Sequence, residues 1–443
     1  MKQKETPDSS FYNGGRKTHW AIVAFAMIGS CMSGVTFVSV PGMVGTSGFG
    51  YLQMCLGFFL GYLVIAFVLT PLYFKLNVVS IYQYLENRFG MASYKTGAWF
   101  FFISKMLGAS VRLFLVCLTL QLLVFGPLGL PFWLNVVCNV AVCLALTFRH
   151  GVKSVIGVDV VRTACMIVAV ALSIFFIGKD LGGIQIHERV FFFDDVNHPQ
   201  YFWKQLLGGL FTVIAMTGLD QDMMQRTLAC KNYRDSQKNL IVSSLLQTVV
   251  IAGFLCLGSL LYQFAAAHGI AETGDSLFPA VATGGLLPAI VGVLFVVGLM
   301  ISAYGAGGSA LTSLTTSFTV DILDKAGEVK VRKAVHLAMA LLMAVTIVVF
   351  NALNSTSAID AVYKLASYTY GPILGLFAFG ILTKKPVKDK FVPIVALLAP
   401  AICLVLQLNS ERWFGGYKFS YELLLLNAAL TFLGLCLLIK RKA

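Results

Sequence analysis

The sequence predicts an all-α integral membrane protein that crosses the bilayer about twelve times. Of its 443 residues, 58% are hydrophobic and 12% are charged, whereas a soluble domain carries about 25% charged residues. Apolar runs of about 20 residues, the length that a helix needs to cross a bilayer, recur along the chain. The cationic residues lie mostly in short loops between these runs. Together these observations exclude a soluble globular protein.

The apolar runs divide the chain into about twelve predicted spans. They lie at residues 20–44, 48–74, 96–126, 130–149, 153–178, 203–222, 238–264, 286–323, 334–353, 357–383, 389–407 and 421–439. Residues 1–18 are polar and charged and lack an apolar core, so we expect no cleavable signal peptide.

The loop charges predict an orientation. Cationic residues precede the first span and follow every even-numbered span, at Lys2, Lys4, Arg16, Lys17, Lys75, Arg88, Lys95, Arg149, Lys153, Arg226, Lys231, Arg234, Lys238, Lys325, Lys330, Arg332, Lys333, Lys384, Lys385, Lys388, Lys390, Lys440, Arg441 and Lys442. Because cationic loops stay in the cytoplasm, both termini are predicted to lie inside, in a multi-pass protein of the bacterial cytoplasmic (inner) membrane. We interpret the net charge of +13 as this signal rather than as a nucleic-acid-binding patch.

Two predicted spans carry matching interruptions. The first has Gly34 in mid-membrane and Pro41-Gly42 at its outer end, and the sixth, at residues 208–220, contains glycine near both ends. The sixth span starts five helices after the first, and an odd offset means that it enters from the opposite side. Paired broken helices in inverted halves are typical of secondary transporters with a site at the membrane midplane. Broken helices expose carbonyls that can bind a cation, and such backbone is tolerated in a membrane where it lines a cavity.

The stretch from Met300 to Asp321 combines apolar length with many Gly, Ser and Thr residues and ends in an acid. Hydroxyls can act as ligands for a hard cation. Small residues also form tight helix–helix contacts that need no ligand. Composition alone leaves both interpretations open.

Several ordered motifs resemble the bacterial sodium/solute symporter family. They are residues 20–42 with Ser33-Gly-Val-Thr-Phe37, then Gly218-Leu-Asp-Gln-Asp-Met-Met-Gln-Arg226, Asp275-Ser-Leu-Phe-Pro279, and residues 312–321. The resemblance implies a polar stub at 1–18, a first five-helix repeat at 19–182, an extracytoplasmic loop at 183–202, an inverted second repeat at 203–385, and two peripheral helices at 386–443. Typical members carry a further helix before the repeats, so the chain resembles a member shortened at the N-terminus.

The resemblance also implies a Na⁺ site. In the family, carbonyls of the first and eighth core helices and two adjacent hydroxyl side chains hold one Na⁺ ion. Here the carbonyls fall on Gly29, Met32 and Ser302, and the hydroxyl pair falls on Gly305 and Ala306, which have no side-chain oxygen. Because a hard cation binds through several oxygens, this change is expected to weaken the site.

A second departure from the family lies in helix five. The family's Thr-Asp-x-x-Gln is replaced by Val158-Asp159-Val-Val-Arg162. Asp159 matches an acid that serves a second ion site in some members, and Arg162 at (i, i+3) could neutralise it without an ion. Either Na⁺ coupling is retained through Ser309, Ser302 and Asp159, or the protein is a sodium-independent or coupling-impaired facilitator or solute sensor.

The charges inside the spans predict an anionic solute. Four cations, Lys105, Arg112, Arg162 and Lys364, stand against the acid Asp159, and ionisable residues in a membrane usually mark a transport pathway. By resemblance to members that carry sialic acid, Arg112 matches the arginine that holds the carboxylate. The alternative for Lys105 and Arg112 is that they snorkel or pair with carbonyls.

Further candidates flank the two breaks. Thr36 and Phe37 follow the first break, where the family places solute contacts, although core packing is the alternative for Phe37. An ion-pair gate is predicted near the end of the sixth span, and a solvated helix end is its alternative. The gate residues are Arg162, Asp220, Asp222 and Arg226.

The sequence therefore predicts a secondary active transporter that imports a small organic anion by alternating access. We expect no cofactor apart from Na⁺ as coupling ion, no nucleic-acid partner, and a monomer in the lipid bilayer. The six histidines lack a catalytic spacing and the ten cysteines lack a metal-ligand spacing, so neither an enzyme nor a transition-metal site is expected.

Overall fold

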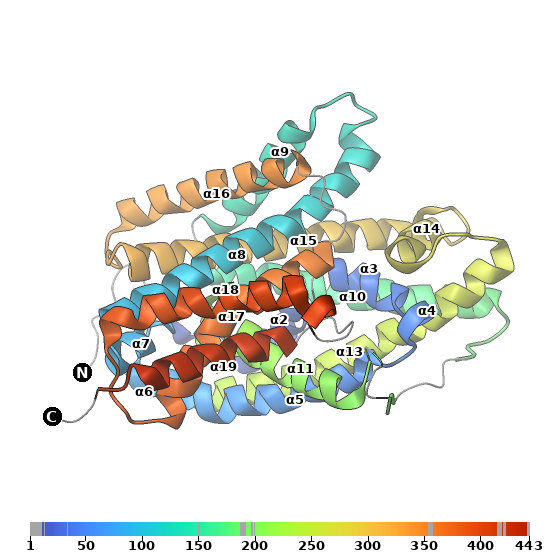
Figure 1. Ribbon diagram of the computed structural model, residues 1–443. Coiled ribbons are helices and arrows are strands. Elements are labelled where there is room, and N and C mark those ends of the chain that lie inside the picture. The colour runs from blue at the N-terminus through green and yellow to red at the C-terminus, as the bar shows by residue number, and fades with distance from the viewer. Residues whose placement is uncertain are drawn as a thin grey trace.

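The computed structural model of the protein describes residues 11–12, 14–32, 34–148, 151–186, 192–195, 198, 200–352, 358–413, 419 and 422–440. Long helices run side by side through the molecule (Figure 1), and the described residues form no strand. The helices that occupy the predicted spans are α2 (Trp20–Cys31) with α3 (Gly34–Gly42), α5 (Tyr51–Val64) with η2 (Ile65–Leu69) and α6 (Thr70–Leu76), α8 (Met91–Leu120) with η3 (Gln121–Phe125), α9 (Phe132–Thr147), α10 (Val152–Asp180), α11 (Phe202–Val213) with η4 (Ile214–Gly218), α13 (Tyr233–His268), α15 (Ala289–Thr316) with η6 (Ser317–Ile322), α16 (Val329–Ala352), α17 (Ala358–Leu382), α18 (Val392–Trp413) and α19 (Glu422–Leu437).

The predicted fold class is confirmed. Within the described residues, 8 helices are long and apolar enough to cross a membrane, α9 and α19 are shorter apolar helices, and two helix pairs bend at a break. The pair Trp20–Cys31 and Thr36–Ser47 bends by 62°, and the pair Phe202–Gly218 and Gln221–Thr227 bends by 73°. The interruptions predicted for the first and sixth spans are therefore present.

The structure also contains short helices that the sequence did not predict. They are η1 (Gly14–Arg16), α4 (Val44–Ser47), α7 (Gln83–Arg88), α12 (Gln221–Thr227), η5 (Gly274–Ser276), α14 (Leu277–Thr283) and η7 (Asp389–Phe391). Of these, α4 and α12 belong to the two bent pairs, and α7, η5 and α14 lie between spans.

Other helices satisfy the backbone that the second break exposes. Tyr73 Oη donates to the carbonyl of Gly218 at 3.0 Å, and Tyr82 Oη donates to the carbonyl of Leu219 at 2.9 Å. Asp220 is extended, at φ −100° and ψ 120°, and its side chain accepts from the first amides of α12. Unpaired backbone groups are costly away from water, so these partners allow the helix to break inside the bundle.

The cation-rich loops meet at one end of the bundle. Arg16 Nη1 donates to Asn77 Oδ1 at 2.6 Å, Lys95 Nζ pairs with Asp324 Oδ2 at 2.7 Å, and Arg88 Nη2 donates to the carbonyl of Thr383 at 2.9 Å. Figure 1 shows α6 and α7 at this end and α4 and α14 at the opposite one. The loops that the charge pattern assigned to one side thus share one face of the molecule.

The small residues of α15 allow close packing against two neighbouring helices, α9 and α10. A Cβ at Gly307 would lie 2.7 Å from Cys143 Sγ, and one at Gly308 would lie 2.9 Å from Thr147 Cγ2, so both glycines form a close seam with α9. Gly305 instead faces α10, where a Cβ would lie 2.9 Å from Arg162 Nη1. The helix-seam and ion-site interpretations of this stretch therefore concern different faces of one helix.

Candidate functional site

A cavity of about 140 Å³ lies between the two broken helices. Its volume is many times the roughly 15 Å³ that a single water requires, so it can hold a small organic solute. The lining side chains come from α2, α3, α5, α8, α10, α11, η4, α12, α13, α15 and α17. Among them are Ser30, Met32, Thr36, Lys105, Arg112, Arg162, Asp220, Asp222, Arg226, Ala306, Ser309 and Tyr370.

One wall of the cavity is a charged cluster that joins α8, α12 and α17. Lys105 Nζ lies 3.2 Å from Asp220 Oδ2 and 2.6 Å from Asp222 Oδ2. Tyr370 Oη donates to Asp220 Oδ2. The other carboxylate oxygen of Asp220 accepts from the amide of Asp222 at 2.7 Å, which caps α12. Asp220 and Asp222 are 3% and 7% exposed, so the solvated helix end considered from the sequence is wrong.

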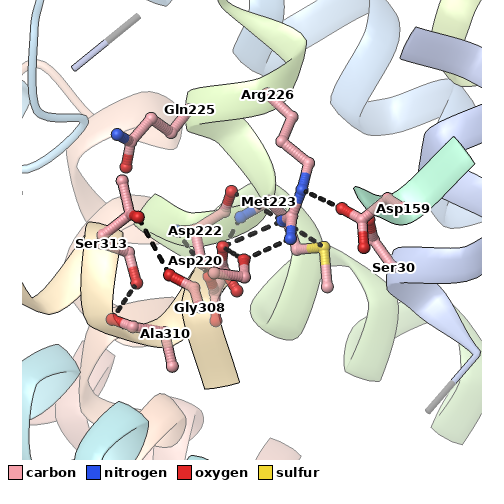
Figure 2. A network of polar contacts seen from close by, with 12 residues as sticks. Ser30, Asp159, Asp220, Asp222, Met223, Gln225, Arg226, Gly308, Ala310 and Ser313 are labelled. Atoms are coloured by element: carbon pink, nitrogen blue, oxygen red, sulfur yellow. Dashed lines mark hydrogen bonds and ion pairs between the residues drawn. The ribbon is translucent and has the colours of Figure 1, made fainter. Parts of the chain in front are cut away.

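Arg226 continues the cluster towards α10. Figure 2 shows its guanidinium between Asp222 on one side and Asp159, beside Ser30, on the other. Arg226 Nε donates to Asp159 Oδ2 at 3.0 Å, and Nη1 donates to Asp222 Oδ1 at 2.9 Å. Ser309 accepts from Arg226 Nη2 and donates to Asp222 Oδ1. The hydroxyl of Ser309 thus bonds to both of these side chains.

Arg162 lies at the positions that the family resemblance assigned to Na⁺. Its Nη2 donates to the carbonyl of Met32 at 3.0 Å, and its Nη1 donates to the carbonyl of Ser302 at 3.2 Å. The same Nη1 lies 3.3 Å from Asp159 Oδ1, so the predicted (i, i+3) pair forms. Both side chains are buried, at 1% and 0% exposure.

The residues around these carbonyls do not fit a Na⁺ ion. Gly305 and Ala306 offer no side-chain oxygen, and the carbonyls of Met32 and Ser302 face a guanidinium. A Cβ at Gly29 would lie 3.3 Å from Arg162 Nε, so the third assigned residue also borders the arginine. A cation that needs oxygen ligands finds nitrogen donors here.

Arg112 has a different environment. It is half-buried on α8 and lines the cavity. It makes no ion pair or hydrogen bond with any residue that the structure describes. Among the described side chains, none occupies its guanidinium in the cavity.

The other residues predicted to contact the solute differ in whether they line the cavity. Thr36 lines the cavity. Phe37 does not; it is 0% exposed and packs against Phe254, Phe278 and Phe295 with ring centroids 5.3–5.6 Å away. The structure therefore favours the packing alternative for Phe37. The side chain of Lys364 lies outside the described part of the chain.

The charge count made from the sequence needs correction. Asp220, Asp222 and Arg226 were assigned to a gate at the helix end and left out of the intramembrane charges, but all three are buried beside the cavity. In the described residues, Lys105, Arg162 and Arg226 pair with Asp159, Asp220 and Asp222. Among the described charged residues at the cavity, the excess positive charge falls on Arg112.

Sequence reasoning missed several polar partners. Ser30 donates to Asp159 Oδ2 at 2.8 Å, and Tyr62 donates to Gln247 Oε1 at 3.3 Å on the opposite wall. Ser30 could have been suspected because it directly precedes the first break. The contact between Tyr370 and Asp220 joins residues 150 positions apart, and no local pattern signals it.

Comparison with known proteins is consistent with these features. The family model described as the sodium:solute symporter family matches residues 11–389. The human sodium/iodide cotransporter is 24% identical over 397 residues, and the match covers 84% of this chain but only 60% of that protein. The sodium/sialic acid symporter NanT of Aliivibrio fischeri is 26% identical over 415 residues, covering 87% of this chain and 79% of the relative.

A solved structure has the same fold. A Na⁺-coupled sialic acid symporter in a substrate-bound outward-open state superposes with a TM-score of 0.78 at 18% sequence identity, covering 98% of this chain and 92% of that one.

Proposed function

The chain belongs to the sodium:solute symporter family, and from this premise we propose that it carries a small organic anion across the membrane by alternating access. The solute binds in the cavity between the break at α2–α3 and the break at α11–α12. Broken helices that enclose a shared cavity are the arrangement on which such transporters rely.

The charge of Arg112, which pairs with no residue in the described part of the chain, carries this proposal. A buried or half-buried guanidinium without a counter-charge is costly, because desolvation is not offset. An anionic solute would supply the missing partner. The planar guanidinium binds a carboxylate through two parallel hydrogen bonds, which favours a carboxylate over a spherical anion. The named cargoes of the two relatives, iodide and sialic acid, are both anionic.

The charged wall supports a role as the gate. Lys105 on α8 holds Asp220 and Asp222 on α12, and the neighbouring Gln221 accepts from the amide of Ile81 in a loop at the cation-rich end. These pairs therefore lie between the cavity and that end. Opening the cavity towards the cation-rich end requires that they separate.

The domain plan and orientation form part of the same proposal. The two repeats span 19–182 and 203–385, the helices of 386–443 lie at their periphery, and the cation-rich end faces the cytoplasm. The positive-inside rule supports this orientation in a bacterial inner membrane.

Uptake into proteoliposomes tests the solute class. The full chain is reconstituted and offered radiolabelled acetate, lactate and N-acetylneuraminate, with glucose as a neutral comparison. We expect saturable uptake of at least one carboxylate and none of glucose. In Arg112→Ala, that uptake should fall roughly 30-fold or more, because one partner of a close charge pair is lost.

Arg234→Ala is the matched control, since Arg234 is an exposed cation outside the cavity. It should leave uptake unchanged. Saturable carboxylate uptake that persists in Arg112→Ala would reject the role of Arg112, and equal uptake of glucose would reject the proposed solute class.

A further inference from the structure

Two arginines occupy the places where the family resemblance would put coupling ions. Arg162 donates to the carbonyls of Met32 and Ser302, which come from the first broken helix and from α15. Both were assigned to Na⁺ by the resemblance. The guanidinium therefore bridges the same two helices that a bound ion would bridge.

The sequence around Arg162 is adapted to its presence. A Cβ at Gly305 would lie 2.9 Å from Arg162 Nη1 and 3.1 Å from Asp159 Oδ1. A serine there would add a hydroxyl in addition to this Cβ. The absence of a side chain at position 305 therefore leaves the space that the Arg162 guanidinium occupies.

Two of the three residues in the alternative ion set are engaged as well, and the third, Ser302, has a buried hydroxyl with no hydrogen-bond partner among the described residues. The set would use Ser309, Ser302 and Asp159. Asp159 has Arg162 against one carboxylate oxygen and Arg226 against the other. Ser309 is engaged by Arg226 and Asp222. An ion at this second place would have to displace a guanidinium from a buried carboxylate.

We propose that Arg162 is a fixed internal cation that takes the structural place of Na⁺, so that the chain binds no Na⁺ between Met32 and Ser302. The inference rests on the proposed transport function for its meaning. A guanidinium stays charged at any physiological pH, and its planar fork can hold several acceptors at once. It therefore ties α2 and α15 together without an ion from solution. Transport by this chain would then not require Na⁺ at this site.

Binding of ²²Na⁺ to the purified full chain tests the inference without any solute. The wild type and the triple variant Arg162→Gln, Gly305→Ser, Ala306→Ser are compared, with unlabelled Na⁺ and K⁺ as competitors. We expect no saturable binding in the wild type. The triple variant regains an amide and two hydroxyls and should bind roughly tenfold more ²²Na⁺ than the wild type, competed by Na⁺ and not by K⁺.

Two further variants control for general effects. Gly298→Ser adds a hydroxyl to the same helix where a Cβ has open space, and Arg162→Lys keeps the cation; neither should bind ²²Na⁺. Saturable Na⁺ binding by the wild type overturns the inference, and this measurement does not depend on the folding of any variant. A triple variant that elutes as the wild type does, yet binds no Na⁺, also overturns it.

The two proposals fail in different ways. Na⁺ binding by the wild type would reject the fixed cation and leave the organic-anion solute standing. Absence of any carboxylate uptake together with absence of Na⁺ binding would reject the solute class and leave the fixed cation standing.

Discussion

Arg162 and Arg112 line the same cavity but have opposite surroundings. Arg162 has 1% exposure, two carbonyl partners and a carboxylate. Arg112 is half-buried and pairs with no described residue. The residue type is the same, so the difference in role comes from the neighbours. A guanidinium with several protein partners holds helices together, whereas one that pairs with no described residue is available to a ligand.

The largest effect is expected where two guanidinium groups share one acid. Asp159→Asn leaves Arg162 and Arg226 buried with one fewer counter-charge, and should lower the free energy of unfolding by about 3–5 kcal/mol. Unfolding of the purified protein in detergent measures this change. Asp324→Asn removes an exposed carboxylate that pairs with Lys95 and should cost no more than about 1 kcal/mol. Equal stability of Asp159→Asn and the wild type would show that Asp159 is not the shared counter-charge.

A second substitution distinguishes the role of Arg112 from that of Arg162. Arg112→Gln should weaken binding of the transported carboxylate by about 2 kcal/mol or more. It should leave the unfolding free energy within about 0.5 kcal/mol of the wild type, because no described partner is lost. Equilibrium binding and thermal unfolding on one preparation check both outcomes. A large loss of stability would mean that Arg112 is structural after all.

The room that Gly305 leaves for Arg162 predicts a smaller effect. Gly305→Ala places a methyl group against the guanidinium and should destabilise the protein by about 1–3 kcal/mol, because the buried arginine must move. Gly298→Ala on the same helix has open space and should be neutral or up to about 1 kcal/mol more stable. The unfolding midpoints of the two variants give the comparison. The expected contrast disappears if both change stability in the same direction.

The smallest effect concerns the aromatic cluster beyond the cavity. Phe37→Leu removes ring contacts with Phe254, Phe278 and Phe295 and should cost about 1 kcal/mol of stability. The affinity for the carboxylate should not change, because Phe37 lies off the cavity lining. A loss of affinity without a loss of stability would restore Phe37 as a solute contact.

The sequence was sufficient to predict the features that depend on local pattern. Hydropathy located the spans, glycine positions located both breaks, and the spacing of Asp159 and Arg162 predicted their ion pair. Each depends on residues within one helix. The alternation of loop charges likewise predicted which loops meet at one end.

Features that depend on how helices pack against each other could not be predicted. The pairing of Lys105 with Asp220 joins residues 115 positions apart. Because of this pairing, the segment that was considered as a solvated helix end forms a wall of the cavity. The reach of Arg162 to Met32 depends on the packing of α10 against the first break. From the sequence, Gly305 only indicated a missing Na⁺ ligand. That it also leaves space for the Arg162 guanidinium could be seen only once the packing of α10 against α15 was known.

An arginine that belongs to the chain stays behind when the solute leaves, unlike a co-transported ion. If Arg162 does the work of Na⁺, each monovalent anion crosses with one uncompensated negative charge. Moving one such charge across the membrane changes the free energy by about 2.3 kcal/mol for roughly every 100 mV of membrane voltage. At equilibrium this corresponds to about a 50-fold ratio between the anion concentrations on the two sides. In a cell with a negative interior this voltage opposes accumulation, so the protein would release or equilibrate its anion rather than concentrate it.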